Sequence, residues 1–290
     1  MLRIFFALIA TLPLSWAHSL GASLGRLVYR LPGRYRNRFD ANIAQSALAT
    51  TADELQQVKK AAVAESGKAL AELPLIWSCS TATLLSLVKA ADGWDSVIAA
   101  KAQGKGLIML TPHLGCFELI GRYLAAQFPI TIMFRPPKQR WLEPLMRTGR
   151  DRDHATLATA DATGVRALLR ALKRGEALGI LPDQAPGAGD GEWANFFGRP
   201  AYTMTLIQRL QARTGAPVIA MYAERLPNAG GYHLHFRVLS EPMASDAAVA
   251  ARQLNQAMED LIRMSPSQYL WSYNRYKIPS GAPPPPIRHG

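Results

Sequence analysis

The sequence predicts an α/β domain, because short apolar segments alternate with stretches of helical periodicity. The segments with the length and composition of strands are 106–110, 130–134, 177–181, 217–223 and 232–239. The stretches expected to be helical lie at 119–127, 162–174, 201–214 and 245–264. Such alternation is typical of a sheet flanked by helices. Residues 232–239 alternate apolar and polar side chains, so this strand is expected to be exposed on one face.

Two further helical regions precede the first strand. Thr51 and Glu54 have the spacing of a capping box, which predicts a helix over 51–73. The apolar residues 74–90 are expected to be helical as well. With 290 residues, the chain is long enough for one large domain or two small ones.

The amino-terminal segment predicts a membrane anchor over residues 1–30. Residues 4–25 include no Asp, Glu, Lys or Arg, and at about 1.5 Å per residue they are long enough to cross a hydrocarbon core of ~30 Å. The arginines that follow are Arg26, Arg30, Arg34, Arg36 and Arg38. These arginines favour a membrane anchor over a cleaved signal peptide, and they predict that the rest of the chain lies in the cytoplasm. Pro13, His18 and Gly21 weaken a spanning helix, so a helix lying in the interface is the alternative.

Composition and charge narrow the function classes. The formal net charge of +12 favours anionic partners, and no zinc-finger or RNP pattern indicates nucleic acid. Cys79 and Cys116 are expected to be reduced, and the six histidines look too scattered to bind a metal. Residues 31–279 would form the main domain, and the proline-rich tail 280–290 is expected to be disordered or PPII.

The residues with catalytic potential lie directly after the strand 106–110. His113 follows that strand, and Glu118 falls just before or inside the next helix. Ligands of open α/β sheets bind beyond the carboxyl ends of strands. If His113 lies in the turn, Glu118 can hold one imidazole nitrogen and leave the other as a general base for a hydroxyl that attacks an acyl thioester. Cys116 is a rival nucleophile, but no partner acid for it stands out, so we interpret it as a packing residue.

An H-x4-E spacing alone is a weak pattern, and three polar clusters strengthen it. Arg135 and Lys138 follow the second strand, and Asp183 with Gln184 follows the third. An aromatic turn over residues 195–201 precedes the next helix. A shared site explains these clusters better than three unrelated loops.

These motifs resemble the lipid A late acyltransferases, the lauroyl and myristoyl acyltransferases of lipopolysaccharide assembly. The matching blocks are His113-x-Gly-Cys-Phe-Glu118, Phe134-Arg-Pro136, Asp183-Gln184, Phe196-Phe197-Gly198, and Trp271 with the following Arg275 and Lys277. Cys116 and Phe117 stand where the family commonly has Asn and Trp, and Tyr273 stands where a His is frequent. The resemblance extends from the anchor to about Pro279.

The resemblance implies a glycerolipid-acyltransferase-like mixed sheet, an apolar acyl groove, and His113 with Glu118 as the catalytic pair. It implies Arg135, Lys138, Asp183, Gln184, Phe197, Gly198 and Arg275 as substrate-binding residues. It also implies acyl carrier protein as donor, a phosphorylated lipid A precursor as acceptor, and no metal or redox cofactor. The expected location is the inner membrane, with the catalytic domain facing the cytoplasm.

Three alternatives remain open. The chain could acylate a lysophospholipid or glycolipid, using acyl-CoA or acyl carrier protein. Water could replace the hydroxyl, giving a thioesterase side activity. A non-catalytic membrane scaffold would not depend on His113. Acyl length is not encoded in any motif.

Overall fold

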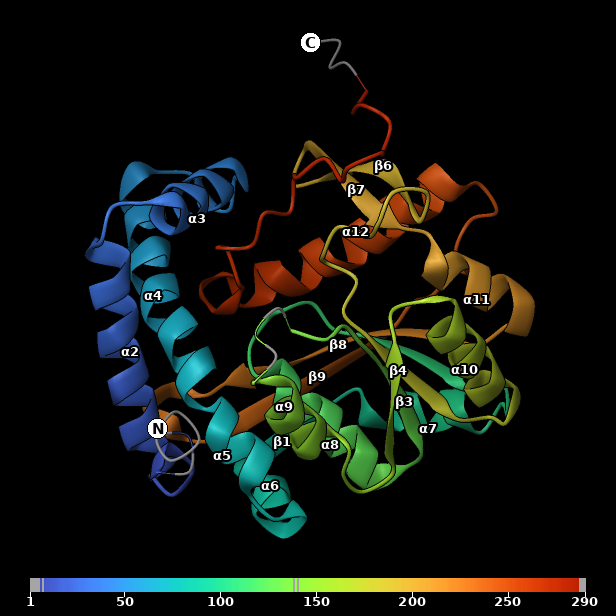
Figure 1. Ribbon diagram of the computed structural model, residues 1–290, viewed down its shortest axis with the longest axis horizontal. Helices are drawn as coiled ribbons and strands as arrows, with labels where there is room; N and C mark the ends of the chain where they lie inside the picture. Colours follow the sequence, from blue (N-terminus) through green and yellow to red (C-terminus); the bar gives the residue numbers. More distant parts are fainter. Residues whose placement is uncertain (1–5, 7, 138, 140, 287–290) are drawn as a thin grey trace.

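A computed structural model describes residues 6, 8–137, 139 and 141–286 of the chain (Figure 1). Lys138, one of the predicted substrate-binding residues, lies outside these residues. The helices are α2 (Leu14–Arg30), α3 (Arg34–Gln45), α4 (Ala52–Ala71), α5 (Leu73–Ser78), α6 (Thr81–Leu87), α7 (Trp94–Lys101), α8 (Phe117–Gln127), α9 (Glu143–Arg150), α10 (Ala162–Lys173), α11 (Leu206–Thr214) and α12 (Ala247–Met264). Within these described residues, 3₁₀ turns lie at Pro227–Ala229 and Pro266–Gln268.

In the part of the chain that the structure describes, the strands form one mixed sheet and one hairpin. The strands are β1 (Val88–Asp92), β2 (Leu107–Leu110), β3 (Ile130–Phe134), β4 (Ala155–Thr159), β5 (Ala177–Ile180), β6 (Gly191–Phe196), β7 (Arg199–Met204), β8 (Val218–Arg225) and β9 (Tyr232–Val238). The main sheet has the order β1-β9-β8-β2-β5-β3-β4, and β6 pairs with β7. Within the described part of the main sheet, β8 and β9 pair antiparallel and the other neighbours pair parallel. The predicted mixed α/β fold is therefore confirmed.

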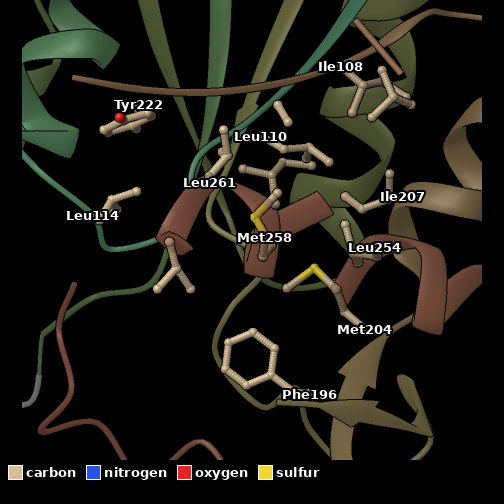
Figure 2. Close-up of a cluster of buried hydrophobic side chains, with 14 of the residues drawn as sticks. Ile108, Leu110, Leu114, Phe196, Met204, Ile207, Tyr222, Leu254, Met258 and Leu261 are labelled. Carbon is tan, nitrogen blue, oxygen red and sulfur yellow. The ribbon is translucent and has the colours of Figure 1, made fainter. Parts of the chain in front are cut away.

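Helices cover both faces of the sheet, so the core has two halves. Ile108 and Leu110 of β2 belong to the half formed with α10, α11 and α12. Leu107 and Met109 belong to the other half, formed with α7 and α8. This alternation follows from the two-residue period of a strand. Figure 2 shows the first half, where Met258 and Leu261 of α12 lie against Leu110.

Most predicted elements are found, with two corrections. The five predicted strands correspond to β2, β3, β5, β8 and β9, and the capping box at Thr51 and Glu54 is formed. The stretch 74–90 is not one helix, because α5 and α6 are separated and β1 begins at Val88. The helix predicted over 201–214 begins only at Leu206. Residues 201–204 lie in β7, opposite β6.

The β6–β7 hairpin explains the second correction. Its two-residue turn has Phe197 at φ 46° and Gly198 at φ 72°. Two consecutive positive φ values are characteristic of the tight hairpin turn whose twist matches that of the strands. The aromatic cluster is therefore a hairpin tip and not the approach to a helix. The tail passes this hairpin, where Trp193 donates a hydrogen bond to the Pro283 carbonyl.

The amino-terminal apolar segment is not one continuous helix. Thr11 and Leu12 form a turn, Pro13 follows it, and α2 starts at Leu14. One side of α2 packs on α4, where Gly21 and Gly67 approach so closely that a Cβ on either would collide with backbone. Among the described residues, no helix has the length and hydropathy needed to cross a bilayer. The spanning helix expected within residues 4–25 is therefore not supported.

A buried ionic cluster ties α2 and α4 to the sheet. Glu72, just after α4, accepts hydrogen bonds from Arg225 of β8 and Tyr232 of β9, and lies 3.1 Å from His18 of α2. Burial raises the pKa of the Glu72 carboxyl, but the charges and hydrogen bonds of Arg225 and His18 outweigh burial and lower the pKa to about 2. Arg225 also donates to the Gly115 carbonyl, so this cluster reaches the loop that carries His113.

We expect Glu72→Gln to lower the free energy of unfolding by about 3–5 kcal/mol, because it leaves buried Arg225 with only the more distant carboxylate of Glu65, 3.5 Å away, as its counter-charge. Glu176→Gln, which breaks an exposed pair with Arg174, should leave the stability almost unchanged. Because the folded pKa of Glu72 is below its ordinary 4.5, the stabilisation is complete above pH 4.5 and is lost as the pH falls towards 2. Urea unfolding of the wild type and of both variants from pH 7 to pH 3 measures these free energies. An equal loss of unfolding free energy in the two variants at neutral pH would contradict the account.

Candidate functional site

The carboxyl ends of three neighbouring strands bring the predicted polar residues together. His113 follows β2, Asp183 and Gln184 follow β5, and Arg135 follows β3. These strands are adjacent and parallel, in the order β2-β5-β3. Parallel strands end at the same edge of a sheet, so the loops that leave them meet there. The structure therefore places these four residues at one edge of the sheet. The third predicted cluster, residues 195–201, belongs instead to the β6–β7 hairpin.

Asp183 orients the His113 ring. Nδ1 of His113 lies 2.8 Å from Oδ1 of Asp183, and the His113 backbone N–H donates to Oδ2 at 2.9 Å. Burial raises the pKa of Asp183, but His113 outweighs burial and lowers the pKa below its ordinary value. An ionised carboxylate only accepts hydrogen bonds, so in the neutral ring Nδ1 carries the proton and Nε2 has the lone pair. Nε2 lies 3.1 Å from the side-chain nitrogen of Gln184, which donates to it.

Glu118 has different partners from those the sequence suggested. Its carboxylate accepts hydrogen bonds from Nε of Arg150 at 2.9 Å, from Nη2 of Arg150, and from Nε1 of Trp77 at 2.9 Å. The structure joins Glu118 to His113 by no hydrogen bond, although both residues are described. Glu118 falls in the first turn of α8, and its side chain faces α5 and α9. The expected hydrogen bond between Glu118 and the His113 ring is therefore not formed, and Asp183 holds the ring instead. The charge of His113 still contributes to lowering the pKa of Glu118.

The Glu118–Arg150 pair is buried and charged. Burial raises the pKa of Glu118, but the charge and hydrogen bonds of Arg150 outweigh it, so the pKa lies below its ordinary value. Burial lowers the pKa of Arg150, but the charge and hydrogen bonds of Glu118 outweigh it and raise the pKa. Arg150, at the end of α9, is thereby fixed with its guanidinium at the wall of the site. No sequence motif indicated this arginine.

Backbone contacts from two distant segments hold the His113 loop. Cys116 N–H donates to the Ala223 carbonyl of β8 at 2.8 Å, and Gly115 N–H donates to the Gln268 carbonyl at 3.1 Å. Gly115 has φ 58°, and a Cβ there would lie 1.9 Å from the Ala223 carbonyl oxygen. The Leu270 N–H closes the loop by donating to the His113 carbonyl. The ring of His113 is therefore presented from a rigid turn.

The site opens into a cavity of about 740 Å³. His113, Gln184 and Arg150 lie in its wall, together with Arg135 and Arg209. Most of the remaining wall is apolar and includes Met133, Met146, Val165, Leu181, Met204 and Leu206. This volume is within the range of about 300–1,000 Å³ that is usual for small-molecule sites. A smaller space of about 40 Å³ under α8 is lined by Glu118 and Gly121 and shares Met133, Arg150 and Leu181 with the cavity.

The other predicted substrate-binding residues have contacts within the scaffold. The Phe197 N–H donates to Glu259 of α12, and the Phe197 ring packs against Trp271. Buried Arg275 donates to the Tyr202 carbonyl and to side chains of α12 and β7. Phe197, Gly198 and Arg275 do not belong to the described lining of the cavity. Their role in binding substrate stays a prediction.

Cys116 is unsuited to act as a nucleophile. It is buried, and burial raises the pKa of its thiol well above the ordinary value. Neither Cys116 nor Cys79 forms a disulfide. A buried, protonated thiol is inert, in agreement with the interpretation of Cys116 as a packing residue.

Comparison with known proteins places this fold and site in a family. The family model of the bacterial lipid A biosynthesis acyltransferases matches residues 1–278. The chain is 25% identical over 282 residues to the lipid A biosynthesis lauroyltransferase of Escherichia coli K12, covering 95% of this chain and 90% of that protein. It is 29% identical over 190 residues to the lipid A biosynthesis palmitoleoyltransferase of the same strain, covering 64% and 60%.

An α/β enzyme with a histidine, a carboxylate and a fixed arginine at a largely apolar cavity fits this comparison. The chain belongs to the bacterial lipid A biosynthesis acyltransferase family, and it is an acyltransferase.

Proposed function

We propose that this enzyme transfers a fatty acyl chain from acyl carrier protein to a hydroxyl of a lipid A precursor, with His113 as general base. The observation that carries the proposal is the orientation of His113. Asp183 holds Nδ1, so the lone pair of Nε2 is directed to the side where Gln184 and the cavity lie. A hydroxyl that displaces the Gln184 amide reaches the same nitrogen.

The reaction follows from this geometry. Nε2 of His113 takes the hydroxyl proton while the oxygen attacks the thioester carbonyl, and the carbonyl oxygen becomes negative. When this intermediate collapses, the C–S bond breaks and the protonated imidazole gives its proton to the leaving thiolate. The Asp183 carboxylate stabilises the imidazolium between these two steps.

In this proposal, Arg150 stabilises the negative carbonyl oxygen of the intermediate. It lies in the cavity wall with His113, and Glu118 holds it through a two-pronged ion pair. A preorganised cation in a partly dry site stabilises the developing charge more than water does. Glu118 is then a positioning residue: it contributes to catalysis by holding Arg150 and not by a hydrogen bond to His113.

The charge of the cavity suits a phosphorylated acceptor. Arg135 and Arg209 lie in its wall with Arg150, and Asp161 and Asp190 lie there as well. Guanidinium groups bind phosphate through paired hydrogen bonds. The net charge of +12 also favours an acidic carrier protein as donor. The apolar part of the wall is the proposed site of the acyl chain.

Val165→Phe is expected to shift the enzyme towards shorter acyl donors. Val165 is on α10 and lines the cavity, so a phenyl ring occupies part of the space for the chain. Each methylene denied burial costs about 0.8 kcal/mol, so two excluded methylenes lower kcat/KM for the longer donor roughly fifteenfold. The measurement is kcat/KM across a series of acyl carrier protein thioesters.

Gly121→Ala is the matched control for this variant. A Cβ at Gly121 meets only Ile132 at 3.7 Å, and the space beside it holds about 40 Å³. The chain-length profile should stay as in the wild type. A shift caused by Gly121→Ala and not by Val165→Phe would place the acyl chain under α8 instead.

We further propose that α2 lies in the surface of the inner membrane, on its cytoplasmic side. The outward face of α2 carries exposed apolar side chains at Trp16, Leu20, Leu24 and Leu27, and Leu31 follows it. Their spacing of three or four residues puts them on one side of the helix. Exposed arginines border this face at Arg26, Arg30 and Arg34. An apolar helix face beside cations is the pattern of an interfacial helix on anionic lipid.

Leu20→Glu combined with Leu24→Glu should lower partitioning of the full chain onto anionic vesicles by at least about tenfold, because both side chains leave lipid and repel its charge. Val249→Glu combined with Met264→Glu on α12 is the control, since it introduces the same two charges at other exposed apolar positions. Co-sedimentation with vesicles measures the effect. Equal loss in both variants would show that added charge, and not the face of α2, decides binding.

The proposed function is tested by incubating the purified chain with acyl carrier protein thioesters and a phosphorylated lipid A precursor. Mass spectrometry should detect an added acyl chain on the lipid, with acyl-CoA a poorer donor. Transfer only to lysophospholipids would overturn the acceptor, and release of free fatty acid alone would identify a thioesterase.

A further inference from the structure

The face of the sheet at β9 brings together three potential metal ligands away from the catalytic cavity. His233 and His235 are two residues apart on β9, so both side chains project from the same face. Asp92, at the end of the edge strand β1, is the register partner of His235. None of the three belongs to the described lining of the cavity or of the space under α8.

The distances among these groups suit one small cation. Nε2 of His233 lies 3.0 Å from Oδ2 of Asp92, and Nδ1 of His235 lies 4.0 Å from the same oxygen. All three ligand atoms lie within 4.8 Å of one another. Bonds of about 2.0–2.2 Å in a tetrahedral site separate ligand atoms by roughly 3.3 Å. Asp92 is 69% exposed, so its carboxylate is free to adjust to a bound ion.

A second carboxylate fixes the tautomer that a metal requires. Nε2 of His235 lies 3.0 Å from Oε2 of Glu224 on β8. When this nitrogen carries the proton and donates to Glu224, the lone pair of Nδ1 faces Asp92. Histidines that bind metals usually donate their other N–H to a carboxylate in this way. Tyr222 stacks on the same ring at a centroid distance of 4.6 Å and holds its plane.

His233 supplies an independent indication. Its Nε2 is shielded from solvent and makes no hydrogen bond within the described part of the chain, although the Asp92 carboxylate is close. The two imidazole rings also lie against each other, with centroids 4.1 Å apart. A buried ring nitrogen without a hydrogen bond needs an explanation, and an ion between the two rings and Asp92 provides one.

We propose that Asp92, His233 and His235 bind a zinc ion, with water in the fourth position and Glu224 as the outer partner of His235. Two imidazoles and a carboxylate are a usual zinc ligand set. The ion would tie the edge strand β1 to β9, where the ladder has a register shift between Val88 and Ala90. This pair of histidines is an exception to the expectation that the histidines are too scattered to bind a metal. The proposal does not depend on acyl transfer.

The test uses the full chain without an affinity tag, stripped with a chelator and titrated with zinc chloride by calorimetry. We expect one zinc per chain and a rise in melting temperature on binding. Asp92→Asn, at an exposed position, should remove most of the binding without harm to the fold, and His233→Ala/His235→Ala should abolish it. Glu224→Gln should weaken affinity about 10–100-fold.

His113→Ala and His154→Ala are the matched controls, because they remove the candidate catalytic histidine and an exposed histidine. Both should bind zinc as the wild type does. The proposal is overturned if the wild type fails to bind zinc, or if the folded His233→Ala/His235→Ala variant binds it unchanged. Loss of binding in His113→Ala alone would place the ion in the cavity and would equally overturn it.

Discussion

Replacing His113 by alanine should lower kcat for acyl transfer by about 10²–10⁴-fold while the fold stays intact. The imidazole removes the hydroxyl proton and later protonates the thiolate, so both bond changes lose assistance. The backbone contacts that hold the loop, to Asp183 and Leu270, do not involve the ring. Steady-state assays with a carrier-protein thioester and the lipid acceptor measure the loss, and melting curves check the fold.

His154→Ala serves as the control for this prediction, since His154 is exposed and outside the described lining of the cavity. Its transfer rate should match that of the wild type. A folded His113→Ala protein with the wild-type rate would refute the general-base assignment and favour a non-catalytic role for this loop.

Arg150→Met should lower kcat by about 10²–10³-fold, because the negative oxygen of the intermediate loses its fixed cation. The substitution also leaves Glu118 buried without a counter-charge, so the free energy of unfolding should fall by about 3–5 kcal/mol. The two effects must be separated before the kinetic loss is assigned to catalysis.

The double variant Arg150→Met/Glu118→Gln separates them. It removes both charges of the pair, so most of the stability should return, whereas transfer should stay as low as in Arg150→Met. Glu118→Gln alone should show an intermediate rate, because Arg150 keeps its charge but loses its main anchor. Recovery of transfer in the double variant would show that Arg150 acts only through stability.

The apolar strands and the polar residues at their ends were predictable from the sequence. β2, β3 and β5 are short apolar runs, and polar residues follow each of them closely. β1 and β4 were not predicted. Several side chains of β1 are exposed, and β4 lies at the other edge of the sheet, so neither has a continuous apolar run.

The pairing of charges within the site was not predictable. The spacing between His113 and Glu118 suggested a local pair, but Glu118 in the first turn of α8 faces Trp77 and Arg150. Asp183 reaches His113 because β5 lies beside β2, which is a property of sheet order and not of chain distance. His233 and His235 likewise gain Asp92 only through the pairing of β1 with β9.

The most direct test of the central claim is ¹⁵N NMR of histidine-labelled protein at neutral pH. The account predicts that neutral His113 carries its proton on Nδ1, hydrogen-bonded to Asp183, with Nε2 unprotonated. Asp183→Asn should change this tautomer, and Glu118→Gln should leave it unchanged. A proton on Nε2 in the wild type, or a tautomer that responds to Glu118→Gln and not to Asp183→Asn, would contradict the account.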